Sequence, residues 1–184
     1  HHARVMKPIP DLDALLARAV AAGIFGTKMR SVILAADPEG VRAVVDQQFE
    51  IAKRIIAAGL VPIIEPEVDI HAADKAEAEK LLVAALAEHL DALPEGRDVL
   101  LKVSIPTVDG LYTPLMEHPR VVRVVALSGG YPRQEANERL ARNPGLIASF
   151  SRALLEGLAD SQDQETFDAA LASTIESIYA ASTT

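Results

Sequence analysis

The chain of 184 residues contains no cysteine and no tryptophan, and aromatic side chains make up only 4% of it. Without cysteine, neither a disulfide framework nor a thiolate metal site can form. No apolar run approaches the roughly 20 residues that a membrane-spanning helix needs. We therefore expect a soluble protein of the cytoplasm. The opening pair His1-His2 carries no targeting pattern, and we exclude it from the fold prediction.

Charge of one sign is not gathered into any long block. The formal net charge is −8, but acidic and basic residues are interleaved along the chain. Such a surface is not built to hold the phosphates of DNA or RNA, so we expect no nucleic-acid partner. Apolar residues make up 49% of the sequence, and the length is that of one ordinary domain. Residues 1–184 are therefore expected to form a single domain with a sizeable core.

Helical patterns alternate with short β-rich runs, which is typical of βα units and a parallel sheet. Five runs are expected as strands, at residues 24–34, 60–64, 99–105, 121–127 and 146–150. Helices are expected at residues 12–22, 38–58, 74–93, 112–117, 134–141, 151–158 and 165–181. Because the strands are almost continuously apolar, helices should cover one face, and a barrel interior or second helix layer the other. A closed (β/α)8 barrel takes about 250 residues, so this chain is too short for the whole fold.

Two predicted strand ends carry pairs of like charges. Lys28 and Arg30 are two residues apart and so lie on one side of a strand, where two cations repel unless they share an anion. Glu65 and Glu67 flank Pro66 in the same way, and two carboxylates held close suit proton transfer near neutral pH. The alternatives are a solvated cationic pair at an exposed strand end, and two solvated acids that begin a loop.

Lys102 stands in the middle of the apolar strand expected at residues 99–105. Burial disfavours the charged form of lysine, and a cationic neighbour such as Lys28 adds to this, which leaves a free amine that attacks carbonyl groups. Lys102 is therefore a candidate Schiff-base nucleophile. The alternatives are a lysine paired with a buried carboxylate, and one that extends outward along its apolar stem.

Glycine and serine follow the last two predicted strands. Gly129 and Gly130, after Ser128, let backbone N–H groups surround an anion, although a tight turn explains them equally well. Ser149 and Arg152 come about one strand later, at the start of a predicted helix that adds a dipole to their hydroxyl and cation. The last two strands of a barrel commonly bind phosphate in this way.

The amino-acid sequence from Met6 to Ser182 resembles that of a known family. The segments that carry the resemblance are, in order, FGTKMRSVI, GLVPIIEPEVDI, VLLKVSIP, VVRVVALSGGY and LIASFSRALLEGL. They resemble class I fructose-bisphosphate aldolases, especially the bacterial branch. The resemblance implies a (β/α)8 barrel, of which this chain supplies about strands four to eight. It also implies reversible cleavage of fructose 1,6-bisphosphate to dihydroxyacetone phosphate and glyceraldehyde 3-phosphate, in glycolysis and gluconeogenesis.

The resemblance assigns a role to each candidate residue. The catalytic positions are Lys102 for the imine, Glu65 for proton transfer, Glu67 for holding the lysines, and Lys28 as a further lysine of the site. Arg30 matches the contact to the far phosphate of the sugar. The positions that bind the phosphate on carbon 1 of the sugar match Ser128, Gly129, Gly130, Ser149 and Arg152. Neither a metal nor a cofactor is implied.

Length is the main departure from the family, whose members have about a hundred further residues that supply the first three barrel strands. Those strands carry an aspartate used in carbon–carbon bond cleavage and a lysine near the far phosphate. Turnover by this chain alone is therefore in question, and we expect a portion of a longer enzyme, a fragment, or a short protein that borrows strands. An open sheet edge invites a partner, either in a homo-oligomer or as a chain that completes the barrel.

Two other functions compete with this aldolase. A non-catalytic sugar-phosphate-binding or structural fragment keeps Lys102 and the phosphate grip. An aldolase for a related phosphorylated ketose uses the same lysine, glutamate and phosphate contacts. Small sugar phosphates are the expected partners in each case, with no role for a membrane.

Overall fold

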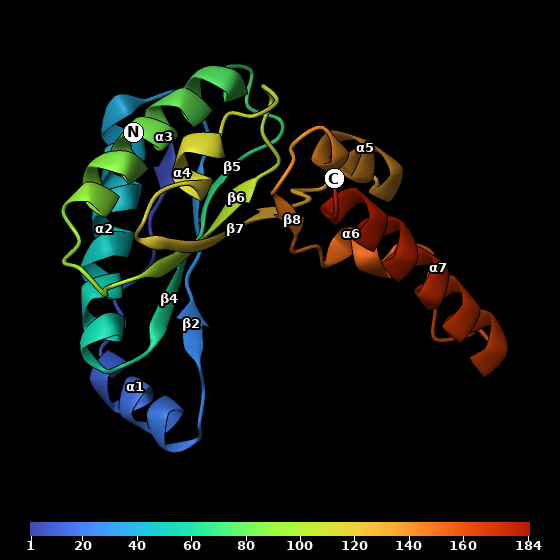
Figure 1. Cartoon of the computed structure of the whole chain (residues 1–184), viewed down its shortest axis with the longest axis horizontal. Helices are drawn as coiled ribbons and strands as arrows, with labels where there is room; N and C mark the ends of the chain where they lie inside the picture. Colours follow the sequence, from blue (N-terminus) through green and yellow to red (C-terminus); the bar gives the residue numbers. More distant parts are fainter.

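The computed structural model describes residues 1–184, which form an α/β fold around parallel strands (Figure 1). One sheet has the strand order β2-β4-β6-β7-β8, with bounds Gly26–Lys28, Val61–Ile64, Val99–Ser104, Val121–Leu127 and Ile147–Ala148. The other has the order β1-β3-β5, with bounds Ala3–Arg4, Ser31–Ile33 and Pro66–Val68. Every pairing is parallel except that of β1 with β3. The predicted parallel sheet is confirmed.

The two sheets are continuous with each other. Gly26 pairs with Val61 and Ser31 with Pro66, so the numbers of paired residues differ by 35 in both ladders. Residues 26–33 therefore act as one strand and residues 61–68 as another, each with a short break. The first of these was predicted as a single strand, whereas the second runs on past its predicted end at residue 64.

The helices begin and end close to their predicted bounds. They are α1 (Leu12–Ala21), α2 (Pro38–Ala57), α3 (Lys75–Asp91), α4 (Thr113–Met116), α5 (Arg133–Ala141), α6 (Arg152–Leu155) and α7 (Gln164–Ser182). The Asp37 side chain caps α2 by accepting hydrogen bonds from two backbone N–H groups. Helix α6 is shorter than predicted, because Glu156 is extended and Gly157 has a φ of +84°. Its four residues add little helix dipole to the Ser149–Arg152 region.

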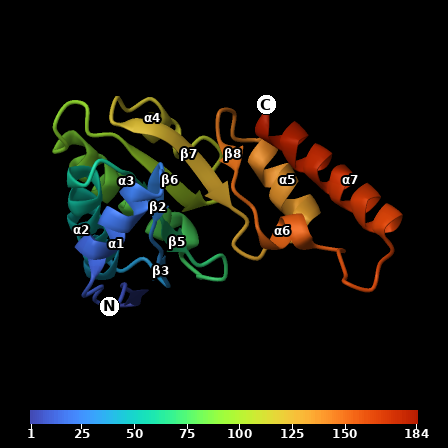
Figure 2. The same ribbon diagram turned by 90° about the horizontal axis from the view of Figure 1, so that it is seen from below.

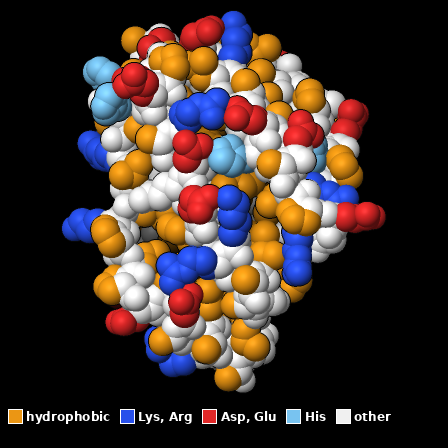
Figure 3. All heavy atoms as spheres, turned by 90° about the vertical axis from the view of Figure 1, so that its left-hand side faces the viewer, with side chains coloured by type: hydrophobic (Ala, Val, Ile, Leu, Met, Phe, Trp, Pro, Cys, Tyr) orange, Lys and Arg blue, Asp and Glu red, His pale blue; other side chains and the backbone are white.

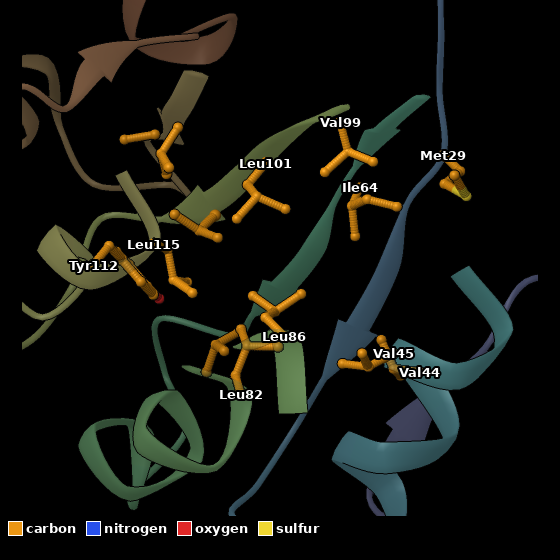
Figure 4. Packing of buried hydrophobic residues seen from close by; sticks show 14 of the residues in the cluster. Met29, Val44, Val45, Ile64, Leu82, Leu86, Val99, Leu101, Tyr112 and Leu115 are labelled. Carbon is orange, nitrogen blue, oxygen red and sulfur yellow. The ribbon is translucent and has the colours of Figure 1, made fainter. Parts of the chain in front are cut away.

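The core lies between one face of the sheet and helices α2, α3 and α4. Ile64 and Leu101 of the sheet face Leu82 and Leu86 of α3 in the close view (Figure 4). All four are fully buried and belong to one cluster of 30 buried apolar residues. Removing this apolar surface from water is the main force that holds the helices against the strands.

The opposite face of the sheet is less well covered. In β6, Val99, Leu101 and Val103 are fully buried, whereas the alternate residues Leu100 and Lys102 are partly exposed. Side chains alternate between the two faces of a strand, so one face packs on helices and the other borders open space. Of the two coverings expected for this face, a second helix layer is absent within residues 1–184, and a barrel interior is consistent with the partly exposed side chains.

Helices α5, α6 and α7 gather beside β8, at the far end of the sheet from α1 and α2 (Figures 1 and 2). Helix α7 packs on both α5 and β8. The Ala148 N–H of β8 donates to the Ser182 hydroxyl of α7 at 3.0 Å. β8 has a strand neighbour, β7, on one side only, and β2 likewise has only β4. These two strands are the edges of the five-stranded sheet.

Acidic and basic side chains are interspersed on the face that carries α2 and α3 (Figure 3). Arg42 of α2 pairs with Glu88 of α3, with 2.8 Å between Nη2 and Oε2. Arg54 of α2 pairs with Asp13 of α1, with 2.7 Å between Nη2 and Oδ1. The interleaved charge expected from the sequence is confirmed on this face. Among the helices, none is sufficiently long and apolar to cross a membrane.

A buried ion pair joins α3 to the loop after β6. The Lys75 ammonium contacts the Glu79 carboxylate, and it donates to the Ile105 carbonyl at 2.8 Å and the Thr107 hydroxyl at 3.0 Å. Glu79 in turn accepts from the Thr107 N–H at 2.9 Å. The pair therefore fixes the backbone directly after the strand that carries Lys102.

Candidate active site

A polar cavity of about 370 Å³ lies at the carboxyl ends of the parallel strands. Only one of its eleven lining residues is hydrophobic. The lining residues are Lys28, Arg30, Glu65, Glu67, Lys102, Leu127, Ser128, Gly129, Ser149, Ser151 and Arg152. Ligands and reacting groups of α/β folds gather at this end of the sheet, so the cavity is the leading candidate for an active site.

Glu65 lies between two lysines in this cavity. Its Oε2 is 3.0 Å from Lys28 Nζ, and its Oε1 is 3.5 Å from Lys102 Nζ. The Glu65 side chain is 4% exposed, against 13% for Lys102 and 49% for Lys28. The Lys28 contact lacks the angles of a hydrogen bond, so Glu65 Oε2 is buried without a hydrogen-bond partner. A buried carboxylate with one oxygen 3.5 Å from a lysine nitrogen is well placed to transfer a proton.

Glu67 pairs with Arg30 across neighbouring strands, with 2.6 Å between Oε2 and Nε. This hydrogen bond raises the pKa of the Arg30 guanidinium, and burial opposes the rise. Glu65 and Glu67 are 3% and 7% exposed, and Glu67 belongs to β5. The alternative in which both are solvated acids of a loop is therefore wrong, because both side chains are buried and strand pairing resumes directly after Glu65.

A tight glycine turn follows β7. Gly129 and Gly130 have φ values of +66° and +118°, which glycine adopts without strain. A Cβ at Gly129 would lie 2.5 Å from Ile70 Cγ2, and one at Gly130 would lie 3.3 Å from Arg152 Nη1. Close packing therefore explains both glycines as well as the turn does. Gly129 lines the cavity, whereas Gly130 lies behind Arg152 and lines an adjoining hollow.

The cavity is positively charged in a protein of net negative charge. Its four cations are Lys28, Arg30, Lys102 and Arg152, and its two carboxylates are Glu65 and Glu67. The formal excess of two positive charges contrasts with −8 for the whole chain. Hydroxyl groups and a glycine turn lie beside these cations, which together suit an anionic ligand. No group of three or more histidine, aspartate or glutamate side chains is placed to hold a metal ion.

The structure brings nine of the ten candidate residues to one cavity, and Gly130 is the exception. Sequence reasoning missed Leu127 and left Ser151 out of the candidate residues. Ser151 sits beside Arg152, so its position at the predicted start of a helix was a usable signal. Leu127 gave none, because an apolar residue at a strand end looks like any other core residue.

Two curated relatives share most of this sequence. The chain is 60% identical over 181 residues to the fructose-bisphosphate aldolase class 1 of Synechocystis, and 56% identical over 181 residues to that of Clostridium acetobutylicum. In sequence, this chain matches the C-terminal part of class 1 fructose-bisphosphate aldolases. Both aldolase matches cover 98% of the chain, which spans 60% and 61% of these relatives. The predicted resemblance is confirmed.

A solved aldolase also shares the fold. The fructose-bisphosphate aldolase of Plasmodium falciparum, solved in complex with TRAP and a small-molecule inhibitor, matches with a TM-score of 0.65 and 21% sequence identity. The match covers 98% of this chain and 67% of that one. At this level of identity the likeness supports the fold alone. No family model matches the chain.

Proposed function

We propose that this chain carries the imine-forming site of a class I fructose-bisphosphate aldolase, with Lys102 as the nucleophile. The observation that carries the proposal is the placement of Lys102 beside the buried Glu65 carboxylate, in a cavity with excess positive charge. Two relatives named as aldolases, at 60% and 56% identity, support the same reaction.

Lys102 reacts as an amine. Its attack on the ketone of the sugar expels the carbonyl oxygen as water and forms an imine. Once protonated, the imine accepts the electron pair of the C3–C4 bond, and glyceraldehyde 3-phosphate leaves as the aldehyde. Protonation of the remaining enamine and hydrolysis then release dihydroxyacetone phosphate and the free lysine. Glu65, whose Oε1 is 3.5 Å from Lys102 Nζ, gives and takes the protons of these steps.

The remaining candidate residues position the substrate and the Glu65 carboxylate. Lys28 forms an ion pair with Glu65, and Glu67 forms one with Arg30. These pairs hold the Glu65 carboxylate and the Arg30 guanidinium in place on neighbouring strands. Arg30 would bind the far phosphate. The one-phosphate would be held by Ser128, Gly129, Gly130, Ser149 and Arg152. Charged and backbone donors of this kind bind phosphate strongly.

We further propose that the sheet supplies strands four to eight of a (β/α)8 barrel, and that residues 1–184 form one partial domain. The edges at β2 and β8 and the partly exposed side chains of Leu100 and Lys102 support this. The barrel would be completed by further residues of a longer enzyme or by another chain, such as a second copy. The reaction belongs to glycolysis and gluconeogenesis in the cytoplasm and needs no metal or cofactor, because the protonated imine is the electron sink.

Borohydride trapping tests this function. Wild-type protein, Lys102→Met and Lys53→Met are incubated with dihydroxyacetone phosphate, reduced, digested and mapped by mass spectrometry. Lys53 is the control because its side chain is 59% exposed and pairs with Glu50 on the surface. One adduct, on the peptide that contains Lys102, is expected in the wild type and in Lys53→Met, and none in Lys102→Met. Folded wild-type protein without an adduct at Lys102 would refute the proposal.

A non-catalytic sugar-phosphate-binding fragment is the second candidate. The chain spans 60% and 61% of its two relatives. The partly exposed sheet face that carries Lys102 favours a partial site that binds but does not turn over. A steady-state cleavage assay separates the two, since the fragment would bind fructose 1,6-bisphosphate without releasing glyceraldehyde 3-phosphate. The same assay with other phosphorylated ketoses tests for an aldolase of related specificity.

A further inference from the structure

Gln48 of α2 has a fully buried side chain although its amide is polar. Its neighbours on the helix, Val44, Phe49 and Ala52, are apolar and fully buried as well. Burying an amide without hydrogen bonds is unfavourable, so a buried glutamine on an apolar helix face calls for specific partners.

Both partners of the Gln48 amide are backbone groups of Glu65. Gln48 Oε1 accepts a hydrogen bond from the Glu65 N–H at 2.8 Å, and Gln48 Nε2 donates to the Glu65 carbonyl oxygen at 3.0 Å. The side-chain amide therefore provides a hydrogen-bond partner for both backbone polar groups of Glu65.

The Gln48 side-chain amide takes the place of one inter-strand hydrogen bond of the parallel ladder. The Met29 N–H donates to the Ile63 carbonyl at 3.3 Å, and the Ser31 N–H donates to the Glu65 carbonyl at 3.1 Å. In an uninterrupted parallel ladder the Glu65 N–H would donate to the Met29 carbonyl. It donates to Gln48 instead, and both strands are broken at this step.

The candidate catalytic groups lie at this break in the two strands. Lys28 precedes the break on one strand, and Glu65 lies in the break on the other, with their side chains 3.0 Å apart. Pro66 follows Glu65, so it contributes no N–H and favours an extended Glu65. The backbone of Glu65 is therefore held by Ser31 on the neighbouring strand and by Gln48 from the helix.

We propose that Gln48 is a positioning residue that directs the Glu65 carboxylate between Lys28 and Lys102. Gln48 does not line the cavity, so it acts through the backbone of Glu65 alone. This inference rests on the proposed function for the assignment of Glu65 as the proton-transfer group. The two hydrogen bonds between Gln48 and the Glu65 backbone do not depend on that assignment.

The preceding residue on α2 supplies a matched control. Gln47 makes the same pair of hydrogen bonds to a backbone, since its Oε1 accepts from the Met6 N–H at 2.7 Å and its Nε2 donates to the Met6 carbonyl at 2.9 Å. Met6 lies outside the cavity. Gln47→Met and Gln48→Met therefore remove equivalent interactions from the same helix, and only the second removes them from Glu65.

Three measurements on the whole chain test the proposal. The first is the rate of borohydride-trapped imine formation with dihydroxyacetone phosphate, and we expect it to fall by about tenfold or more in Gln48→Met, because small misplacements of a reacting group are costly. The second is the NMR signals of the lysine ε-methylene groups, where those of Lys28 and Lys102 should move. The third is hydrogen exchange, in which the Glu65 amide should lose protection. Gln47→Met should show none of these changes.

The outcomes separate this inference from the proposed function. If the wild type forms no imine but the lysine signals move in Gln48→Met alone, the proposed function fails and the positioning role stands. If imine formation and lysine signals are unchanged in a folded Gln48→Met protein, the positioning role is refuted. Should Gln48→Met not fold by circular dichroism, Gln48→Asn retains an amide that is one methylene too short to span Glu65, and the same three measurements decide.

Discussion

Lys75 and Glu79 lie one turn apart on α3 and form the most deeply buried ion pair of the protein, with side chains 6% and 0% exposed. Their remaining bonds go to Ile105 and Thr107, directly after the strand that carries Lys102. A buried pair is satisfied only while both partners are present, because either one alone leaves an uncompensated charge in the interior.

Glu79→Gln should therefore destabilise the protein strongly. We expect the free energy of unfolding to fall by about 3–5 kcal/mol, since the Lys75 ammonium would remain buried without its counter-charge. The control is Glu77→Gln, which removes a surface partner of Lys80 at 3.2 Å and should cost less than about 1 kcal/mol. Urea unfolding measures both. Equal costs for the two variants would show that the buried pair contributes no more than the exposed one.

The contribution of Lys75 to the stability of the protein should rise with pH in the alkaline range. Burial lowers the pKa of the Lys75 ammonium below its usual value of 10.5, although Glu79 acts in the opposite direction. Between the lowered pKa and 10.5 the unfolded chain binds more protons than the folded one, so the free energy of unfolding increases with pH there. Urea unfolding at a series of pH values should show this gain relative to Lys75→Met. A decline relative to that variant would mean that the attraction of Glu79 outweighs burial.

Gly129→Ala should impair the glycine turn of the cavity. A Cβ there would meet Ile70 Cγ2 at 2.5 Å, in addition to the strain of a positive φ. Gly59→Ala is the control, because Gly59 has a φ of +84° but nothing within 4 Å of the added Cβ. Strain alone costs about 1–2 kcal/mol, so the control should lose this much stability and keep its affinity for dihydroxyacetone phosphate. Calorimetric titration should show weaker binding for Gly129→Ala only. Unchanged binding would place the phosphate elsewhere.

Arg30→Met should separate the two ends of the substrate. If Arg30 binds the far phosphate, its loss removes a charge-assisted contact worth about 1.5–3 kcal/mol, which is roughly a tenfold to hundredfold loss of affinity for fructose 1,6-bisphosphate. Imine formation with dihydroxyacetone phosphate, which lacks that phosphate, should change much less. Arg42→Met is the control, since Arg42 pairs with Glu88 on the surface. Equal losses with both ligands would show that Arg30 acts through Glu67 instead.

Local patterns in the sequence determined most of the secondary structure. The predicted bounds of α1 and α2 agree with the structure, where Asp37 caps α2 and the positive-φ residues Gly23 and Gly59 follow the two helices, because such effects act within a few residues. The period of two along a strand likewise placed Lys28 with Arg30 and Glu65 with Glu67 on common sides. Family resemblance then joined these pairs to Lys102 and the glycine turn.

Only the tertiary structure decided how distant residues meet. Gln48 looks like an ordinary polar residue of a helix, and its two hydrogen bonds to the Glu65 backbone depend on how α2 packs on the sheet. Lys75 and Glu79 read as surface charges of a helix, yet the loop after β6 covers them. The sequence therefore determined which residues lie on each strand and helix, through local sterics and periodicity. Long-range packing determined which of them are buried, paired and held in place around Glu65.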